Sequence, residues 1–217
     1  MNFKFYLISI LFGISLISLI ATLKNENKTY HFTFKPLTIL LIIFLGIASK
    51  DFRDNSFNQL ILIGLLFSFI GDVLLMFGKK EFLYGMGSFF LAHVFYINAF
   101  YIDSMKFNLI LFLIIFGITS AYYFYLYSTL YSYRGPVLLY SLIIGTMLYF
   151  AISHFLLDNQ IVGKLILSGA ILFTISDMLL AIRRFKGNFP LSSELVYLTY
   201  FPAQYLFCLT IWTNNYI

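Results

Sequence analysis

Two aspartates, Asp72 and Asp177, lie inside long apolar segments of the chain, where a charged side chain is energetically costly. A carboxylate at the centre of a bilayer costs at least ~2.5 kcal/mol on insertion scales, so intramembrane acids usually serve binding or proton transfer. These two are the only acids within the eight apolar segments given below, each about one and a half turns before its helix leaves the membrane. Both helices run in the same direction, so we expect the two carboxyl groups at similar depth in the cytoplasmic half.

Other polar side chains are expected in the same layer of the membrane. His93 lies about three turns into the segment that follows Asp72, and Lys35 begins an earlier segment on the same side. The remaining members of the group are Ser68, Ser176, Tyr197, Tyr200 and Gln204. Together these residues predict a polar pocket that opens toward one leaflet and has apolar and aromatic walls.

Each of these residues also has a purely structural interpretation. The aspartates could simply neutralise Lys35 or Arg183. Lys35 could extend its ammonium group to the membrane surface, and His93 could be a hydrogen-bonded helix contact. Ser68 and Ser176 are more often packing residues than nucleophiles, and small residues near Ser68 allow helices to approach closely.

Eight apolar segments are available to position these side chains, because a helix needs ~20 mostly apolar residues to cross a membrane. The predicted spans are Phe5–Leu23, Phe34–Ser49, Phe57–Phe77, Phe82–Ile102, Phe107–Tyr127, Gly135–Leu157, Lys164–Ile182 and Leu195–Thr213. The second is short and opens at Lys35-Pro36, with the proline expected in the first helical turn, where its missing N–H is not needed. We interpret the first as a membrane anchor, because its apolar run exceeds the ~7–15 residues typical of a signal peptide.

The composition agrees with this interpretation. Of 217 residues, 61% are hydrophobic and only 11% are charged, whereas soluble domains carry about 25% charged residues. This excludes an ordinary cytosolic enzyme, a disordered chain and a nucleic-acid-binding protein. The single cysteine, Cys208, excludes an intrachain disulfide and a multi-cysteine metal site. We therefore predict an all-α polytopic transmembrane helix bundle of about eight spans, with residues 1–217 forming one integral membrane domain.

Basic residues in alternating connections predict the orientation of the bundle. One side carries Lys4, Lys50, Arg53, Lys106 and Lys164, and the other carries Lys24, Lys28, Lys35, Lys79, Lys80, Arg134, Arg183, Arg184 and Lys186. The excess on the second side predicts that both termini face away from the cytoplasm, in the inner membrane if the protein is bacterial. The net charge of +5 then reflects orientation and attraction to anionic lipids.

The two halves of the chain resemble each other at an offset of 105 residues. Residues 64–75, GLLFSFIGDVLL, align with residues 169–180, GAILFTISDMLL, so that the two aspartates coincide. The spans that follow also resemble each other, with FLAH at 90–93 in one and FPAQ at 201–204 in the other. Chance similarity between hydrophobic helices is the alternative to a parallel repeat of four plus four helices, an arrangement known among membrane transporters.

An ordered set of motifs resembles the YhhN-like membrane proteins, a family that includes lysoplasmalogenases. The motifs are FKPLT at 34–38, residues 64–72, residues 87–96, residues 169–177 and YFPAQYL at 200–206. They fall in order from the second span to the eighth, so the resemblance covers most of the chain. The first span and the tyrosine-rich middle of the chain carry little of it.

The resemblance implies hydrolysis of the vinyl-ether bond of a lysoplasmalogen to a fatty aldehyde and a glycerophospho-headgroup. Such cleavage begins with protonation of the alkenyl carbon, and water then attacks the oxocarbenium ion. This requires one carboxylic acid and one carboxylate, a division of labour like that of glycosidases. Two carboxyl groups in a pocket of low dielectric can supply both forms. On this hypothesis Asp72 and Asp177 are the acid/base pair, in an undecided order, and His93 tunes or relays protons.

The same hypothesis gives the remaining residues a substrate-binding role. Lys35 would bind the substrate phosphate or one aspartate, and Tyr200 and Gln204 would bind water or the glycerol hydroxyl. Ser68 and Tyr197 complete the group. No metal or other cofactor is required, and the expected partners are a lysophospholipid substrate and membrane lipids, with no nucleic acid. The headgroup, the chain preference and the oligomeric state stay open.

Two other functions also stay open. A lipid transporter or proton-coupled transporter without hydrolase activity would equally use parallel repeats with matched intramembrane acids. A zinc-dependent lipid amidase of the ceramidase type is disfavoured, because the three histidines are far apart and none has i, i+4 spacing. The chain contains no G-x-S-x-G motif, P-loop or H-E-x-x-H motif.

Overall fold

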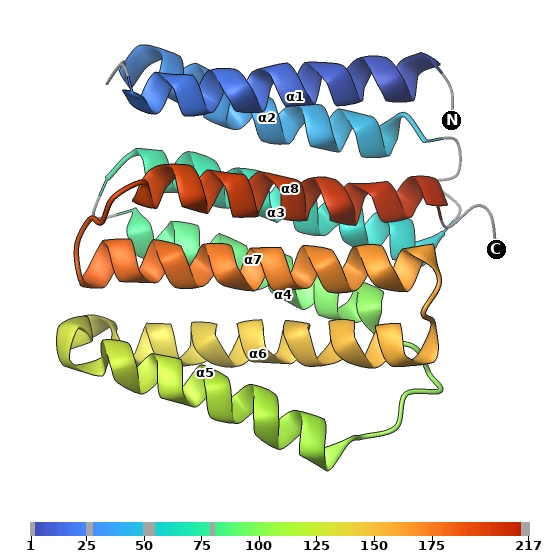
Figure 1. Ribbon diagram of the computed structural model, residues 1–217, viewed down its shortest axis with the longest axis vertical. Coiled ribbons are helices and arrows are strands. Elements are labelled where there is room, and N and C mark those ends of the chain that lie inside the picture. Colours follow the sequence, from blue (N-terminus) through green and yellow to red (C-terminus); the bar gives the residue numbers. More distant parts are fainter. Residues whose placement is uncertain (1–2, 25–27, 50–54, 79–80, 214–217) are drawn as a thin grey trace.

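A computed structural model describes residues 3–24, 28–49, 55–78 and 81–213 and shows a bundle of long helices (Figure 1). The elements are α1 Phe3–Lys24, α2 Lys28–Ile47, α3 Ser56–Met76, α4 Phe82–Phe100, α5 Leu109–Leu130, the short 3₁₀ helix η1 Tyr131–Tyr133, α6 Arg134–Leu157, α7 Ile161–Phe185 and α8 Ser192–Thr213. Each predicted span corresponds to one α-helix, and the described part of the chain contains no strand. The predicted all-α class is confirmed.

The helices have the length and surface of membrane spans. Six stretches of the described chain are long and apolar enough to cross a membrane, and the longest, Leu109–Leu157, contains both α5 and α6. The apolar part of α2, Phe32–Ile47, is shorter. Large apolar side chains such as Ile17 and Leu113 project outward, where they suit contact with lipid. The predicted polytopic membrane bundle is therefore confirmed, with the exact number of full spans set by how α2 is counted.

Helix α2 begins earlier than the sequence predicts. It starts at Lys28, so Pro36 lies inside the helix and not in its first turn. Pro36 has no N–H to donate to the carbonyl of Phe32. Such prolines are tolerated in membrane helices, because neighbouring helices, Ser/Thr side chains, ordered waters or small local changes of the helix satisfy the freed carbonyl. Pro136, by contrast, lies in the first turn of α6, where its missing N–H is not needed.

The helices run alternately in opposite directions, and the described ends of α1 and α8 lie at the same end of the bundle (Figure 1). Helices α3 and α4 pack together, as do α7 and α8, and these pairs form the centre. Helix α2 packs against α3 and α8, while α6 packs against α7 and α4. Helices α1 and α5 cover α2 and α6 from outside (Figure 1). The main contacts of the first four helices thus recur among the last four, as a four-plus-four repeat requires, although the contact of α3 with α8 has no counterpart of similar extent.

Two matched glycines bring the central helices close together. A Cβ atom at Gly64 of α3 would collide with the ring of Tyr96 on α4, and one at Gly169 of α7 would collide with the ring of Phe207 on α8. Tyr96 and Phe207 are fully buried and their ring centroids lie 4.7 Å apart. Each of the two matched glycines therefore leaves space for one aromatic ring. The two rings meet in a shared core that lies deeper in the bundle than the polar residues.

Candidate active site

A polar cavity of about 430 Å³ lies at the end of the bundle opposite the two termini. Its wall includes side chains from four helices: Lys35, Asp72, Asp177, Arg183 and Tyr200. Lys35, Asp72 and Asp177 are only 6%, 3% and 7% exposed. The structure therefore brings both aspartates to one cavity, because they occupy the same late position in the parallel helices α3 and α7.

Asp72 has a donor on each carboxylate oxygen. The Lys35 Nζ atom lies 3.0 Å from Oδ1 and donates to the backbone carbonyl of Asp72 at 3.2 Å. The Tyr200 hydroxyl donates to Oδ2 at 2.7 Å. A cation on one oxygen and a hydroxyl donor on the other form the environment of an ionised carboxylate. Of the two roles considered for Lys35, this geometry shows the pairing with an aspartate.

Asp177 has a different set of neighbours. The Tyr140 hydroxyl donates to its Oδ2 atom at 3.1 Å, and the His93 Nε2 atom lies 3.4 Å from the same oxygen. His93 Nδ1 lies 2.7 Å from the carbonyl oxygen of Phe89. A carbonyl only accepts, so Nδ1 carries the proton of the neutral ring and Nε2 presents a lone pair.

In this tautomer, His93 Nε2 and Asp177 Oδ2 are both hydrogen-bond acceptors, with one proton position between them. His93 Nε2 is fully buried and has no hydrogen bond within the described residues. At 3.4 Å, the pair is longer than a normal hydrogen bond. A proton between these two atoms would complete the contact, whereas Asp72 already has a donor on each carboxylate oxygen.

Four further polar residues line the cavity, and three of them make contacts between helices. The Ser176 hydroxyl donates to the Val196 carbonyl at 3.2 Å and so links α7 to α8. Arg183 donates to the Ser193 hydroxyl at 2.6 Å. Arg184 lies over the ring of Phe82, 4.4 Å from its centroid, and Tyr197 is a buried member of the wall. Ser176 thus matches its structural interpretation as a helix contact.

Two residues predicted to bind substrate, Ser68 and Gln204, lie deeper than the polar cavity and do not line it. The Gln204 amide nitrogen donates to Ser68 at 3.0 Å, and its oxygen accepts from Tyr96 at 2.6 Å. All three residues are fully buried. The reason is helical rise: Gln204 lies about one turn beyond Tyr200 toward the centre of the bundle.

The sequence prediction omitted Tyr140, although the repeat contained a signal for it. Tyr140 follows Lys35 by 105 residues, the same offset that separates Asp177 from Asp72. Lys35 and Tyr140 therefore occupy equivalent positions on α2 and α6, and each contacts the aspartate of its own half.

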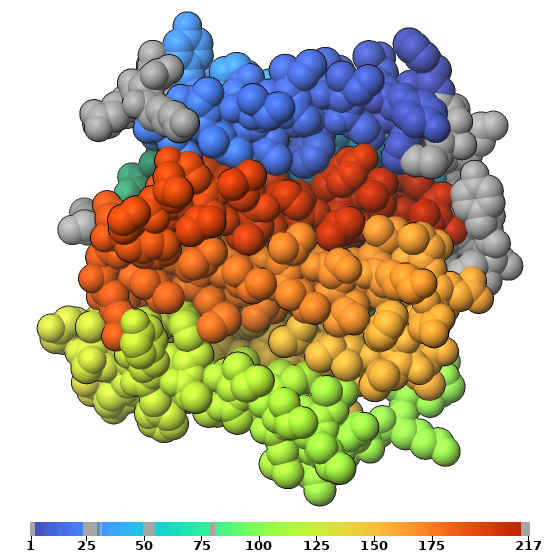
Figure 2. All heavy atoms as spheres, viewed as in Figure 1, coloured from blue at the N-terminus to red at the C-terminus, as the bar shows by residue number. Residues whose placement is uncertain are grey.

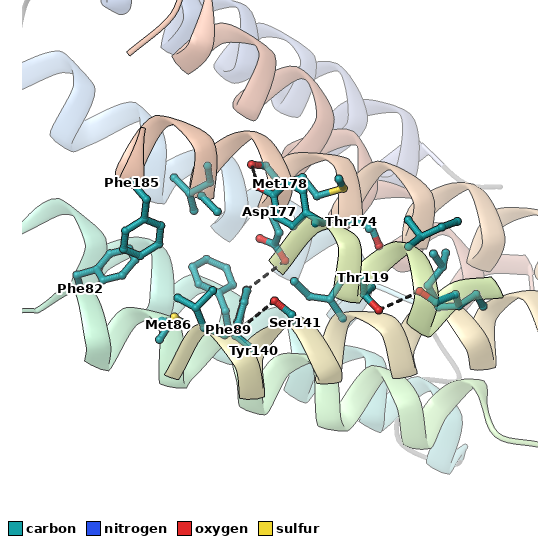
Figure 3. Close-up of a pocket in the computed structure, with 18 of the residues that line it drawn as sticks. Phe82, Met86, Phe89, Thr119, Tyr140, Ser141, Thr174, Asp177, Met178 and Phe185 are labelled. Carbon is teal, nitrogen blue, oxygen red and sulfur yellow. Dashed lines mark hydrogen bonds between the residues drawn. The ribbon is translucent and has the colours of Figure 1, made fainter. Parts of the chain in front are cut away.

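A second, apolar cavity of about 100 Å³ adjoins Asp177 between α4, α5, α6 and α7 (Figure 3). Residues that line both cavities are Leu75, Phe82, Phe89, Asp177 and Leu180. Asp177 is the only polar residue of this shared wall. Figure 3 shows it beside Tyr140, with the rings of Phe82 and Phe89 on one side. Asp177 therefore lies where the polar cavity meets the apolar one.

The donor set of the cavity suits proton transfer. Among the residues that the structure describes, no three His, Cys, Asp or Glu side chains come together in a way that could hold a metal ion. His154 lies near the opposite end of the bundle, with Nδ1 2.8 Å from the Phe100 carbonyl oxygen. Cys208 is buried and donates to the Ile42 carbonyl. The reactive groups that the polar cavity presents are therefore two carboxyl groups, each with different partners.

Comparisons with known proteins agree with the motifs. A model of the YhhN family matches residues 30–211. A mouse protein named lysoplasmalogenase TMEM86B is 28% identical over 183 residues, which are 83% of this chain and 74% of that protein. Human lysoplasmalogenase TMEM86A is 30% identical over 155 residues, 69% of this chain and 64% of that protein. An Escherichia coli O157:H7 protein, named uncharacterized membrane protein YhhN, is 36% identical over 66 residues, 30% of this chain and 31% of that protein. No solved structure matches the chain.

Proposed function

This chain belongs to the YhhN family, and from that membership we propose that it is a lysoplasmalogenase-like hydrolase that cleaves the vinyl-ether bond of lysolipids. Relatives about 30% identical bear the name lysoplasmalogenase, which supports a lipid hydrolase. One observation carries the proposal: a single cavity holds two buried aspartates, one paired with a lysine and the other with a histidine. That is the acid and carboxylate combination that vinyl-ether hydrolysis needs.

Asp177 is the general acid in this mechanism. Its proton goes to the alkenyl carbon one bond beyond the ether carbon, which turns the vinyl ether into an oxocarbenium ion. His93 shares the proton position of Asp177, and the Phe89 carbonyl holds its ring in the tautomer whose Nε2 accepts a proton. His93 therefore positions the acid and relays its replacement proton. The Tyr140 hydroxyl orients the same carboxyl group.

Asp72 is the carboxylate in this mechanism. It stabilises the oxocarbenium ion and accepts a proton from the water that attacks the ether carbon. In the resulting hemiacetal, the hydroxyl proton passes to the glycerol oxygen as the bond to that oxygen breaks, which releases the fatty aldehyde and the glycerophospho-headgroup. The proton taken up by Asp72 then restores Asp177, so the cycle consumes one water and no cofactor.

The other predicted binding residues take roles that follow from their positions. Lys35 and Tyr200 act on the substrate through Asp72, because both contact its carboxylate. Tyr197 lines the same cavity and is the proposed contact for the glycerol hydroxyl. Ser68 and Gln204 support the floor of the cavity, because Gln204 donates to Ser68 and accepts from Tyr96.

The proposal is tested by incubating purified protein with a 1-alkenyl lysophospholipid and measuring aldehyde and headgroup by mass spectrometry. Wild-type protein should release both products, and Asp72→Asn and Asp177→Asn should lose this activity. The matched control is Asp103→Asn, because Asp103 is exposed in the connection between α4 and α5. Absence of aldehyde from the wild type, or full activity in either site variant, would overturn the proposal.

The bond that breaks is tested separately. In water labelled with heavy oxygen, the released headgroup should keep its unlabelled glycerol oxygen, because cleavage occurs on the alkenyl side. In deuterated water, the aldehyde should carry one deuterium on the carbon next to the carbonyl. An acyl lysophospholipid of the same chain length should stay intact. Label in the glycerol hydroxyl would contradict attack at the ether carbon.

The shared packing pattern of the two halves favours one alternative, a lipid transporter or proton-coupled transporter. Reconstituted liposomes distinguish it from the hydrolase. Flux of lysolipid or protons without aldehyde release would support the transporter, whereas aldehyde release without flux would support the hydrolase.

We propose that the cavity faces the cytoplasm and both termini face away from it. The support is the basic excess on the cavity side, together with the start of α1 and the end of α8 at the opposite end of the bundle (Figure 1). Four residues that contribute to this prediction, Lys50, Arg53, Lys79 and Lys80, lie outside the described residues. Labelling of a cysteine introduced at Asp103 by an impermeant reagent in intact cells would test it, with the single native cysteine, Cys208, buried.

A further inference from the structure

The polar and apolar cavities meet at Asp177, and we infer that together they hold one lysolipid in a defined orientation. The phosphate headgroup occupies the polar cavity, the hydrocarbon chain enters the apolar cavity, and the ether bond lies at Asp177. This inference rests on the proposed function and specifies how its substrate binds.

The wall of the apolar cavity suits a hydrocarbon chain. Its hydroxyl groups are largely engaged within the protein: Thr119, Tyr122 and Ser141 all donate to backbone carbonyls. The Tyr140 hydroxyl donates to Asp177. A ligand in this cavity therefore meets mostly carbon atoms and has few polar groups to bind, which favours an apolar ligand.

The apolar cavity is open on the side that faces lipid. Ile118 of α5 lines it and is 61% exposed. The molecular surface is recessed between α5 and α7 (Figure 2). A volume of about 100 Å³ is too small for a whole lipid tail. The structure therefore accommodates the part of the chain next to the ether, while the rest passes beside Ile118 into the bilayer.

The polar cavity contains positive charge suited to a phosphate. Lys35 is neutralised by Asp72, but Arg183 and Arg184 also line the cavity. Neither arginine forms a salt bridge with any residue that the structure describes. The Ser193 hydroxyl and the Phe82 ring hold the two guanidinium groups in place. Guanidinium groups bind phosphate oxygens with paired hydrogen bonds, so these two arginines are the proposed headgroup contacts.

The order of groups along a lysolipid then determines which aspartate meets which atoms. Phosphate, glycerol, ether oxygen and alkenyl carbons follow one another, so the alkenyl carbons lie on the chain side. Asp177 is the only polar residue that lines both cavities, whereas Asp72 lines only the polar one. Asp177 is therefore placed to protonate carbon, and Asp72 is placed on the side that water can reach. The position of each aspartate relative to the two cavities and the hydrogen-bond partners of each aspartate thus support the same assignment of acid and carboxylate.

The chain part of the inference is tested by filling the apolar cavity with Thr119→Phe and, separately, Ser141→Leu. Each should raise the KM for a long-chain lysoplasmalogen about tenfold, while a short-chain vinyl-ether analogue is cleaved at nearly the wild-type rate. The matched control is Ser120→Phe, which places the same ring on the exposed side of α5 next to Thr119. If both filling variants keep the wild-type ratio of long-chain to short-chain rates, the inference fails while the hydrolase proposal stands.

A binding measurement separates this inference from the proposed function. A lysolipid that carries a photoreactive diazirine on the chain near the ether is irradiated with Asp177→Asn protein, which cannot turn the probe over. Crosslinks should map to α5 and α6 around Thr119 and Ser141, and decrease in the filling variants but not in Ser120→Phe. Crosslinks confined to other helices would overturn the binding mode, whatever the activity of the wild type.

The headgroup part is tested with the double variant Arg183→Gln/Arg184→Gln. Its preference for a lysoplasmalogen over the corresponding 1-alkenylglycerol, which has no phosphate, should fall about tenfold. The control is Lys186→Gln, which removes a nearby basic residue that lies over the Tyr125 ring and does not line the cavity. An unchanged preference in the double variant would overturn phosphate binding at this position.

Discussion

The two halves of the bundle place their aspartates at equivalent positions and surround them with different partners. Asp72 lies late in α3 and Asp177 lies late in α7, in matching sequence motifs. Within the first half, the neighbouring helix α2 supplies Lys35, and at the equivalent position of the second half α6 supplies Tyr140. The side chain that contacts the aspartate from this position is therefore a buried ammonium group in the first half and a neutral phenol in the second half.

The opposite half adds a second difference. Tyr200 of α8 donates to Asp72, whereas His93 of α4 presents its Nε2 atom to Asp177. A phenol supplies a proton to a carboxylate, while a neutral imidazole also accepts one. The two halves thus supply two similar carboxyl positions, and in the proposed mechanism four neighbouring side chains divide them into a stable carboxylate and a proton donor. Four predictions test this division, in order of expected effect.

Asp177→Asn should have the largest effect on catalysis. Asparagine keeps the shape of the side chain and accepts from Tyr140, but it has no proton to transfer. Aldehyde release should fall roughly 10²–10⁴-fold. The melting temperature should change little, because the His93 ring can remain neutral. Mass spectrometry of the products and thermal unfolding in detergent measure both quantities. Near-normal aldehyde release would show that Asp177 is not the acid.

Tyr140→Lys should make the second half resemble the first. An ammonium group at this position would pair with Asp177 and keep it ionised, so aldehyde release should fall roughly a hundredfold although both aspartates remain. Tyr140→Met, of similar length and without charge, is the control and should retain more activity. Equal rates in the two variants would mean that the charge beside Asp177 does not matter.

Asp72→Asn should also remove most aldehyde release, and unlike Asp177→Asn it should clearly lower stability. It leaves the buried ammonium of Lys35 without its carboxylate, which should lower the free energy of unfolding by about 3–5 kcal/mol. Adding Lys35→Met should restore most of that stability without restoring activity. Thermal unfolding of the single and double variants is the measurement. A fully stable Asp72→Asn protein would refute the ion pair as a structural element.

Two tyrosine variants should have the smallest effects and should differ from each other. Tyr200→Phe removes a hydrogen bond to an ionised carboxylate, worth about 1.5–3 kcal/mol, and should lower kcat about tenfold or more. Tyr140→Phe removes a hydrogen bond to a group that holds a proton, worth about 1 kcal/mol, and should lower it only several-fold. A larger effect in Tyr140→Phe would reverse the proposed assignment of acid and carboxylate.

The sequence predicted the fold well because membrane helices are encoded locally. Each apolar run had to become a helix, since the bilayer leaves backbone groups no other partners. The error at the start of α2 arose from treating Pro36 as a boundary, although the helix continues through it. The repeat was visible in the motifs around Asp72 and Asp177, because a glycine and an aspartate recur there at the same spacing.

The candidate site was predicted less completely. The polar cavity is lined by five of the predicted residues: Lys35, Asp72, Asp177, Tyr197 and Tyr200. His93 does not line this cavity but contacts Asp177. Ser68 and Gln204 were placed in the correct helices but lie one turn too deep to line it. The apolar cavity between α4 and α7 was not foreseen, because leucine, phenylalanine and isoleucine look alike in sequence whether they face lipid or a cavity.

The chain alone therefore encodes how deep each polar residue lies, because depth follows from counting residues along a helix at a rise of about 1.5 Å each. It also encodes which charges are out of place, since an acid within an apolar run is costly wherever that helix packs. The packing of eight helices decided the rest, because rotation of each helix about its axis depends on its neighbours. That rotation directs Lys35 to Asp72 and His93 to Asp177, and places Asp177 at the junction of two cavities.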